Sequence, residues 1–195
     1  MGRRLGGRNH AVPYDVVYEQ NAPVAEQKLY RVVKGVVWLV RTGEDGSAVV
    51  VDEVYPGGYF GQETLCAGFY RTEARQMFPD GIVEEVLWPE LSRSEQRAVH
   101  RDIADRLANN RWPERVLSGK IRERLLSYLT SLAEKGLGKK VGRSTEVFLP
   151  RHEDLALVLA STRETITMAL GELRRRQLVS VKDANTFVIP VRRSA

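Results

Sequence analysis

Short apolar runs alternate with turn residues through the first 90 residues of the chain. The runs are rich in β-branched and aromatic residues, which is typical of strands, and they cover residues 16–18, 29–33, 36–40, 48–51 and 54–55. Glycine and proline separate them, for example at residues 43–46 and 56–58. Short strands at such close spacing predict a barrel, a sandwich or a roll.

After this region the apolar positions recur at helical spacing. Val99, Ile103 and Leu107 follow one another at four-residue intervals, with charged residues between them. Ser92 and Ser94 are the candidate N-caps of this helix. The apolar stripe of a long, isolated helix needs a partner. That partner is either the β domain or the same helix of a second subunit.

The C-terminal part of the chain mixes helical and strand patterns. Leucines at helical spacing predict a helix over residues 121–135, and the three glycines of residues 136–142 predict a loop. Residues 146–150 predict a short strand. Two β-branched runs, 178–182 and 186–189, predict a β-hairpin near the C-terminus.

Two short amphipathic helices are predicted between that strand and that hairpin. The first covers residues 154–160, and the second lies within residues 161–174, where Ile166, Leu170 and Leu173 form one apolar stripe. Only about three residues separate the helices, which is the spacing of a helix-turn-helix motif. The second helix of such a motif enters the DNA major groove, and the hairpin after it forms a wing.

Charge gathers in the same region. Residues 118–195 contain 15 lysines and arginines and 8 acidic residues, a net charge of +7, whereas residues 1–117 contain 15 and 17, a net charge of −2. Basic charge supplies the sequence-independent part of DNA affinity. Charge and motif together predict DNA binding. The alternative is a binding module whose winged helix contacts protein. Salt-dependent retention on DNA would distinguish these two hypotheses.

Several classes of protein are excluded or disfavoured. The chain has no run of 18 apolar residues, which argues against a membrane span, and its basic N-terminus lacks the apolar stretch of a signal peptide. We therefore expect a cytoplasmic protein. No serine–histidine–aspartate set, paired carboxylates or phosphate-binding glycine loop suggests an enzyme.

The histidines and the cysteine suggest neither a metal nor a redox cofactor. His10, His100 and His152 are isolated from one another, and the single cysteine, Cys66, excludes an internal disulfide and a four-cysteine cluster within one chain. Cys66 is either a packed small residue or an oxidation-sensitive thiol.

Three passages resemble the cyclic-AMP receptor protein/fumarate-nitrate regulator (CRP/FNR) family of bacterial transcription factors. They are residues 29–37 with the glycines of 46–61, the helix of residues 95–110, and residues 150–166. The resemblance implies an α+β protein with three parts: an N-terminal β-roll at residues 1–90, a dimerisation helix and hinge at residues 91–117, and a C-terminal winged helix-turn-helix domain at residues 118–195.

The resemblance also implies a mode of action. The helix carrying Val99, Ile103 and Leu107 would pack against its twofold mate in a homodimer. The dimer would present two recognition helices roughly 34 Å apart, one DNA turn, to an inverted repeat of double-stranded DNA. Family resemblance favours an activator that contacts RNA polymerase.

The recognition helix of this family opens with a small or hydroxyl residue followed by Arg-Glu, matched here by Thr162, Arg163 and Glu164. Met168 stands where the cyclic-AMP-responsive branch has a second arginine. Arg163 can donate two hydrogen bonds to guanine O6 and N7, and Glu164 can accept one from cytosine N4. Met168 can only pack on a thymine methyl. We therefore predict a half-site with a G·C-rich contact and one relaxed or changed position.

Other polar residues of the motif are expected to complete the DNA contacts, mostly to phosphates. They are Arg151, Ser161, Thr162, Thr165, Thr167 and Arg174. For Arg174 the first expectation is a favourable interaction with the helix macrodipole at the C-terminal end, and a phosphate contact is the alternative. Glu164 has an alternative role in a capping box, with its carboxylate turned back on the amide of Ser161.

Nucleotide-binding members of the family place a Gly-Glu pair at the ribose and an Arg-Ser/Thr pair at the cyclic phosphate. This sequence has Gly61-Gln62 and Arg71-Thr72 in those places. A neutral amide bonds a hydroxyl more weakly than a carboxylate does, and Glu63 is expected to point elsewhere. We therefore expect a regulator without a cofactor, with control by a cyclic nucleotide or another small ligand as the alternative.

Overall fold

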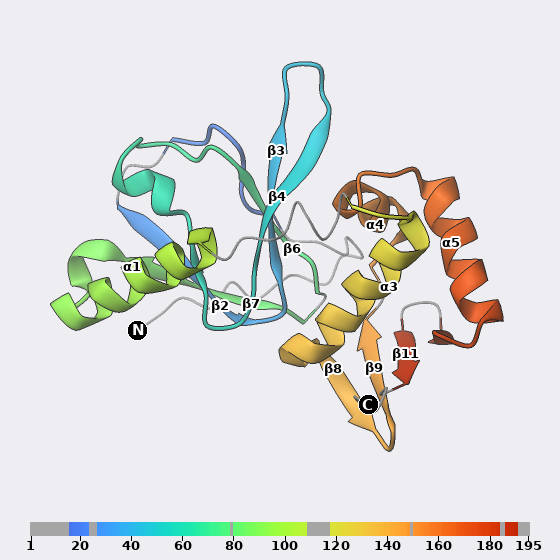
Figure 1. Cartoon of the computed structure of the whole chain (residues 1–195). Coiled ribbons are helices and arrows are strands. Elements are labelled where there is room, and N and C mark those ends of the chain that lie inside the picture. Colours follow the sequence, from blue (N-terminus) through green and yellow to red (C-terminus); the bar gives the residue numbers. More distant parts are fainter. Residues whose placement is uncertain are drawn as a thin grey trace. The chain divides into compact units, whose positions relative to one another are not determined.

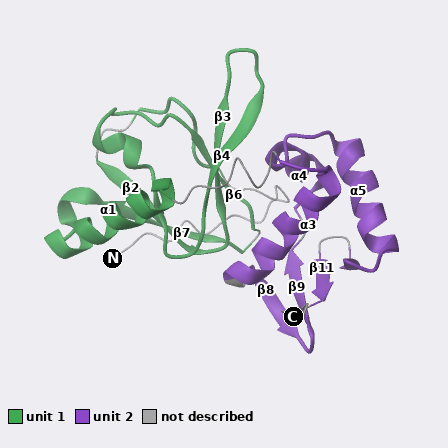
Figure 2. Ribbon diagram, viewed as in Figure 1, with its two compact units in different colours: residues 1–110 green, residues 111–195 purple. Residues whose placement is uncertain are grey.

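The computed structural model describes residues 16–23, 27–78, 80–108, 118–148, 150–183 and 186–190. The chain divides into two compact units, residues 1–110 and residues 111–195 (Figure 2). Residues 91–108 of the predicted dimerisation helix and hinge fall within the first unit, and the remaining residues of that prediction, 109–117, lie outside the described residues. The predicted winged helix-turn-helix falls within the second unit.

In the described part of the first unit, seven strands form two antiparallel sheets, ordered β1-β6-β3-β4 and β5-β2-β7. Four of the five predicted strands are present, and β5, β6 and β7 are added to them. The separate strand predicted at residues 54–55 is wrong, because Val54 is the last residue of β4. The strands are β1 Val16–Tyr18, β2 Lys28–Lys34, β3 Val37–Thr42, β4 Ala48–Val54, β5 Tyr59–Phe60, β6 Glu73–Gln76 and β7 Ile82–Leu87. Two 3-10 turns, η1 Gln62–Leu65 and η2 Trp88–Glu90, follow β5 and β7.

Aromatic side chains make up much of the core of this unit. The rings of Tyr18 and Tyr70 stack with their centroids 3.7 Å apart, and those of Tyr30 and Phe60 lie 5.3 Å apart. Valines and leucines of the facing strands, such as Val32 and Val37, surround them. Burying each large apolar side chain contributes about 1.5–3 kcal/mol, so this cluster holds the two sheets together.

A long helix, α1 Arg93–Ala108, follows η2 (Figure 1). Of the two candidate N-caps, Ser92 takes the role: its hydroxyl accepts a hydrogen bond from the Glu95 amide at 3.3 Å, and the Glu95 carboxylate accepts one from the Ser92 amide at 2.8 Å. This reciprocal capping box lowers the pKa of Glu95 through its hydrogen bonds to Ser92.

The apolar stripe predicted for dimerisation is not uniform. Val99 is 0% exposed within the single chain, whereas Leu107 is 68% exposed and Ile103 is half-buried. Val99 therefore has no surface left for a second subunit, and the prediction that it is a dimer contact is wrong. An apolar side chain is stabilised by any surface that shields it from water, and Val99 is already covered by other residues of its own chain.

Two polar contacts join α1 to the strands of its own unit. The carboxylate of Asp102 accepts a hydrogen bond from the Tyr59 amide at 3.0 Å, and Nε of Arg106 lies 3.0 Å from a carboxylate oxygen of Asp52 in β4. One side of α1 is thereby fixed to the β domain, and Leu107 lies outside that side.

The second unit, over its described residues, contains three α-helices and a four-stranded antiparallel sheet ordered β10-β11-β9-β8. The elements are α3 Ile121–Leu132, a π-helical turn η3 Ala133–Leu137, β8 Gly138–Val141, β9 Ser144–Phe148, α4 His152–Val158, α5 Arg163–Arg175, β10 Ser180–Asp183 and β11 Thr186–Pro190. The predicted C-terminal hairpin is confirmed as β10 and β11.

The loop predicted over residues 136–142 is wrong. Residues 138–141 form β8, which pairs with β9. Gly138 serves close strand packing rather than a loop, because a Cβ atom there would lie 2.4 Å from Cγ2 of Thr145 and 2.8 Å from the carbonyl oxygen of Glu146. Gly142, with φ of 59°, makes the actual turn.

The core of the second unit is aliphatic. Helix α3 packs against α5, and buried leucines of α3 such as Leu125 and Leu129 provide much of the apolar surface. An ion pair between Arg122 of α3 and Glu172 of α5, 2.5 Å apart, reinforces this packing. Its hydrogen bond lowers the pKa of Glu172. The recognition helix is thus held along its length by the rest of its unit.

Candidate nucleic-acid interface

Helices α4 and α5 have the arrangement of a helix-turn-helix motif (Figure 1). Four residues, 159–162, separate them, one more than predicted. Ala160 bends the chain with a φ of 44°, in the left-handed region that non-glycine residues seldom adopt, and the Ser161 amide donates to the Ala156 carbonyl at 2.9 Å. This tight turn sets where the first residues of α5 begin.

Helix α5 has one buried side and one exposed side. Ile166 and Leu173 are 0% exposed, whereas Met168 is 67% exposed. The predicted base-facing residues share the exposed side; they are Arg163, Glu164, Thr167 and Met168. The predicted division of this helix into an apolar stripe and a polar face is confirmed.

The cap of α5 differs from the predicted one. Thr162, not Ser161, is the N-cap, and its hydroxyl oxygen accepts a hydrogen bond from the Thr165 amide at 3.2 Å. The hydroxyls of Thr162 and Thr165 also bond one another at 2.9 Å. Glu164 is exposed at the second helical position, so its alternative role in a capping box is wrong. The N-cap lies one residue later than the capping box requires, which moves every capping position by one.

Side-chain contacts connect the start of α4 with the first turns of α5. Nε of Arg163 lies 2.9 Å from Oε1 of Glu153, and Nδ1 of His152 lies 2.8 Å from Oγ1 of Thr167. Glu153 was missed by sequence reasoning, because no periodic pattern within either helix reveals a contact between them. A charged residue in the first turn of the first helix, opposite an arginine opening the second, is the signal that could have found it.

The other predicted DNA contacts lie around this surface. Arg151 immediately precedes α4, is exposed, and its Nε donates to Oδ2 of Asp154 at 3.0 Å. Ser161 lies in the turn between the helices, and Arg174 is exposed in the last turn of α5. Arg174 follows Arg163 by eleven residues, about 16 Å along the helix axis. The structure therefore groups all of these residues except Arg174 near the N-terminal end of α5.

The wing carries a charge pair of its own. Lys182 of β10 donates to both carboxylate oxygens of Glu146 in β9, at 2.8 and 2.9 Å, and this hydrogen bonding raises the pKa of Lys182. The pair bridges strands on either side of β11. It fixes the hairpin to the sheet beside the motif.

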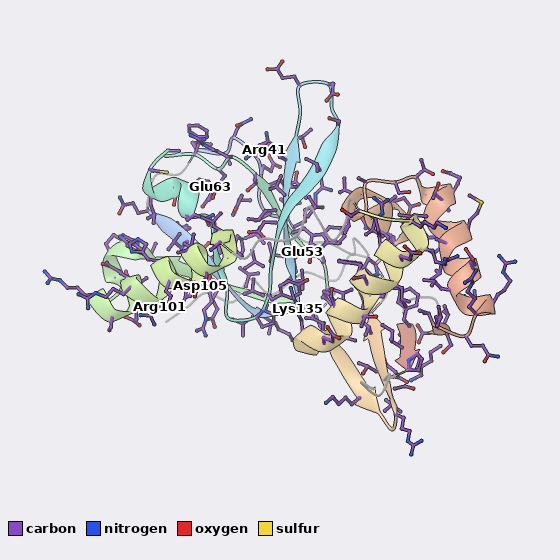
Figure 3. All side chains as sticks on the ribbon, in the orientation of Figure 1. Arg41, Glu53, Glu63, Arg101, Asp105 and Lys135 are labelled. Carbon is purple, nitrogen blue, oxygen red and sulfur yellow. The ribbon has the colours of Figure 1, made fainter. Side chains whose placement is uncertain are left out.

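The predicted effector residues lie at and after η1. Gly61 has a φ of 82°, and a Cβ there would lie 3.2 Å from the ring of Tyr30, so glycine is required. Thr72 is 3% exposed and donates from its hydroxyl to Glu63 at 3.2 Å, whereas Arg71 is exposed. Figure 3 labels Glu63 at η1. Glu63 therefore points toward Thr72, one of the two residues predicted at the phosphate.

Several buried polar atoms of this region lack a hydrogen-bond partner. Among the described residues these include the Tyr18 hydroxyl, Oε1 of Gln62, Oε2 of Glu63, and Nη1 of Arg106. Burial raises the pKa of Tyr18, and the negative charge of Glu63 raises it further. The β domain therefore holds a polar, poorly solvated region containing both a carboxylate and a guanidinium.

Cys66 follows η1 and is exposed, so its interpretation as a packed small residue is wrong. Within the described ranges, no group of three or more histidine, cysteine or acidic side chains is placed to hold a metal ion. Among those same residues, every helix is too short or too polar to span a membrane.

Comparison with known proteins supports the motif directly. Residues 123–193 match the family of Crp-like helix-turn-helix domains. The chain is 30% identical over 171 residues to transcriptional regulator SdrP of Thermus thermophilus, covering 83% of this chain and 79% of SdrP. It is also 30% identical over 166 residues to transcriptional regulator LdrP of the same organism, covering 83% and 82% of the two chains.

Solved structures show the same likeness across both units. TTHB099, a CRP-family transcriptional regulator from Thermus thermophilus, superposes with a TM-score of 0.80 at 26% identity, covering 91% of this chain and 89% of that one. The β-rich domain followed by a helix-turn-helix domain defines a DNA-binding transcription regulator with a cyclic-nucleotide-binding-like fold. The chain belongs to the CRP/FNR family of transcription regulators.

Proposed function

We propose that the protein acts as a homodimer that reads an inverted-repeat DNA site with one α5 helix from each subunit. The observation that carries this proposal is the exposed row of Arg163, Glu164, Thr167 and Met168 on a helix whose opposite side is fully buried. A buried side fixes the helix, and an exposed row of hydrogen-bonding side chains can meet base edges in the major groove.

Within that row, Arg163 is the proposed guanine reader and Glu164 the proposed cytosine reader. Arg151, Ser161, Thr162, Thr165 and Arg174 are the proposed phosphate contacts. The N-terminal end of α5 adds its own unpaired amides and positive dipole end, which favour an approaching phosphate.

The proposed dimer contact is the exposed part of α1 around Leu107, with Ile103 at its border. The exposure of a large apolar side chain on a helix otherwise fixed to its own β domain supports this choice. We further propose that the regulator is an activator that contacts RNA polymerase, as is typical of the family.

We also propose that DNA binding needs no cyclic nucleotide. Three features of the residues that the resemblance assigns to a nucleotide support this: Gln62 has a neutral amide in place of the family's carboxylate, Arg71 is exposed, and Thr72 donates to the carboxylate of Glu63. A cyclic phosphate placed at Thr72 would face that negative charge. The guanidinium of Arg106 on α1, paired with Asp52, already supplies a cation to this region.

Selection from a random pool of duplex DNA by the purified protein, with and without cyclic AMP, tests the proposal. We expect enrichment of the same inverted repeat in both conditions. Enrichment only with cyclic AMP would contradict effector independence. Absence of enrichment in both would contradict DNA reading and favour a winged helix that binds protein.

Met168→Arg is expected to add a preference for guanine at one position of each half-site. Met168 is 67% exposed and lies one helical turn beyond Glu164, so an arginine there can reach the next base edges. The expected discrimination is about 1–3 kcal/mol against other bases. Selected sequences of this variant should differ from wild type at that position only, while those of Met168→Leu should not differ. Identical sequences for all three proteins would show that Met168 does not face the bases.

A further inference from the structure

One ion pair joins the two helices of the motif on the side proposed to face DNA. Glu153 is the second residue of α4, Arg163 is the first residue of α5, and their Oε1 and Nε atoms are 2.9 Å apart. The two side chains are 59% and 64% exposed. Exposed ion pairs contribute little to the stability of a fold, so any role of this pair lies in function rather than in stability.

A second contact keeps the two helix starts together. The hydroxyl of Thr167 donates to the Arg163 carbonyl at 2.9 Å, so its oxygen is left to accept a hydrogen bond from Nδ1 of His152 at 2.8 Å. His152 directly precedes Glu153. The backbone of Glu153 is therefore fixed beside the first turn of α5, and its carboxylate stays within reach of Arg163.

The contact leaves the end of the guanidinium open. Glu153 occupies Nε, on the side of the group, so the two terminal nitrogens can still donate to guanine O6 and N7. The pair as a whole has no net charge. A guanine edge carries no net charge and loses only part of the strength of its hydrogen bonds, whereas an anionic phosphate loses its net Coulombic attraction and meets a carboxylate as well.

We propose that Glu153 is a specificity-determining residue that makes Arg163 a reader of bases rather than a binder of phosphates. This inference rests on the proposed function of α5. Glu153 weakens binding to non-cognate DNA, where Arg163 could otherwise pair with the backbone, more than it weakens binding to the cognate site. Glu153 repels a phosphate that approaches Arg163, and it also orients Arg163 toward the guanine edge.

Glu153→Gln tests the inference, because it keeps the size and the hydrogen-bonding oxygen but removes the charge. Affinities for the selected inverted repeat and for random duplex DNA are measured across a salt series. One additional phosphate contact in each subunit steepens the salt slope of the dimer by about 1.8, which is roughly 60-fold in affinity between 1 M and 0.1 M salt. We expect that change for random DNA and a smaller one for the cognate site, so that the ratio of the two affinities falls.

Two controls make the result specific. Glu134→Gln removes the same charge from η3, outside the α4–α5 pair, and should leave the affinity ratio unchanged. In an Arg163→Ala background, Glu153→Gln should no longer change the ratio. The melting temperature should stay at the wild-type value, which a structural role of the pair would not allow.

The outcomes separate the inference from the function on which it rests. An unchanged affinity ratio in Glu153→Gln, with wild-type protein that discriminates between DNA sequences, would overturn the role of Glu153 alone. A fall in cognate affinity with random-DNA affinity unchanged would also overturn it, since Glu153 would then only orient Arg163. Wild-type protein that does not discriminate would overturn the proposed function and this inference together.

Discussion

Arg163→Ala is expected to weaken binding to the cognate half-site by about 1–3 kcal/mol and to relax the choice of one base pair. The physical reason is the loss of a bidentate donor to guanine, whose O6 and N7 would then face no partner in the groove. Folding should not change, because the side chain is exposed while the helix is held by Ile166 and Leu173 on its other side. Competition binding with cognate and single-substituted duplexes measures both effects.

Arg174→Ala is the matched control, since it removes an exposed arginine from the last turn of the same helix. It should weaken binding to all sequences alike and reduce the salt slope by about 1 per subunit, or about 2 for the dimer, as expected for a phosphate contact. If Arg163→Ala keeps the wild-type ratio between cognate and random DNA, the base-reading role assigned to Arg163 is wrong. If Arg163→Ala weakens binding to all sequences alike and also reduces the salt slope, as expected of Arg174→Ala, then Arg163 is a phosphate contact.

The faces of the recognition helix could be predicted because they depend on local periodicity alone. Ile166 and Leu173 repeat at helical spacing, and a helix presents such residues on one side whatever lies opposite. The wing could be predicted for a similar reason, since its β-branched runs flank a short turn. In both cases the relevant information lies within fewer than twenty consecutive residues.

Edge strand β8 shows where local pattern fails. Lys139 and Lys140 are exposed, and Gly138 packs against β9, so the segment has the composition of a loop. Edge strands commonly carry lysines because these discourage pairing with other chains. The strand is defined by its hydrogen bonds to β9, and the sequence of residues 138–141 alone does not predict that pairing.

Contacts between elements were the other feature that could not be predicted from the sequence. Periodicity placed Val99 and Leu107 on one stripe, but only packing decides that Val99 is buried in its own chain while Leu107 remains exposed. Glu153 and Arg163 are ten residues apart with a turn between them, and their pairing depends on how that turn folds.

Leu107→Glu is expected to dissociate the homodimer and to lower affinity for the inverted repeat by roughly 10²–10⁴-fold. A dimer binds its second half-site as an intramolecular event, and a monomer loses that gain although each recognition helix is intact. The charge would have to be buried at the contact proposed around Leu107, which is 68% exposed in the single chain. Sedimentation measures the oligomeric state, and titration of whole and half sites measures the affinity.

Ala98→Glu provides the control on the same helix. Ala98 is exposed and precedes Leu107 by nine residues, or two and a half helical turns at about 3.6 residues per turn, so the two lie on opposite sides of α1. This variant should stay dimeric with wild-type affinity. Half-site affinity should be equal for all three proteins, since α5 is unchanged in each. A Leu107→Glu protein that remains dimeric would place the contact elsewhere, and a dimer lost equally in Ala98→Glu would show that charge on α1 matters rather than the side that carries it.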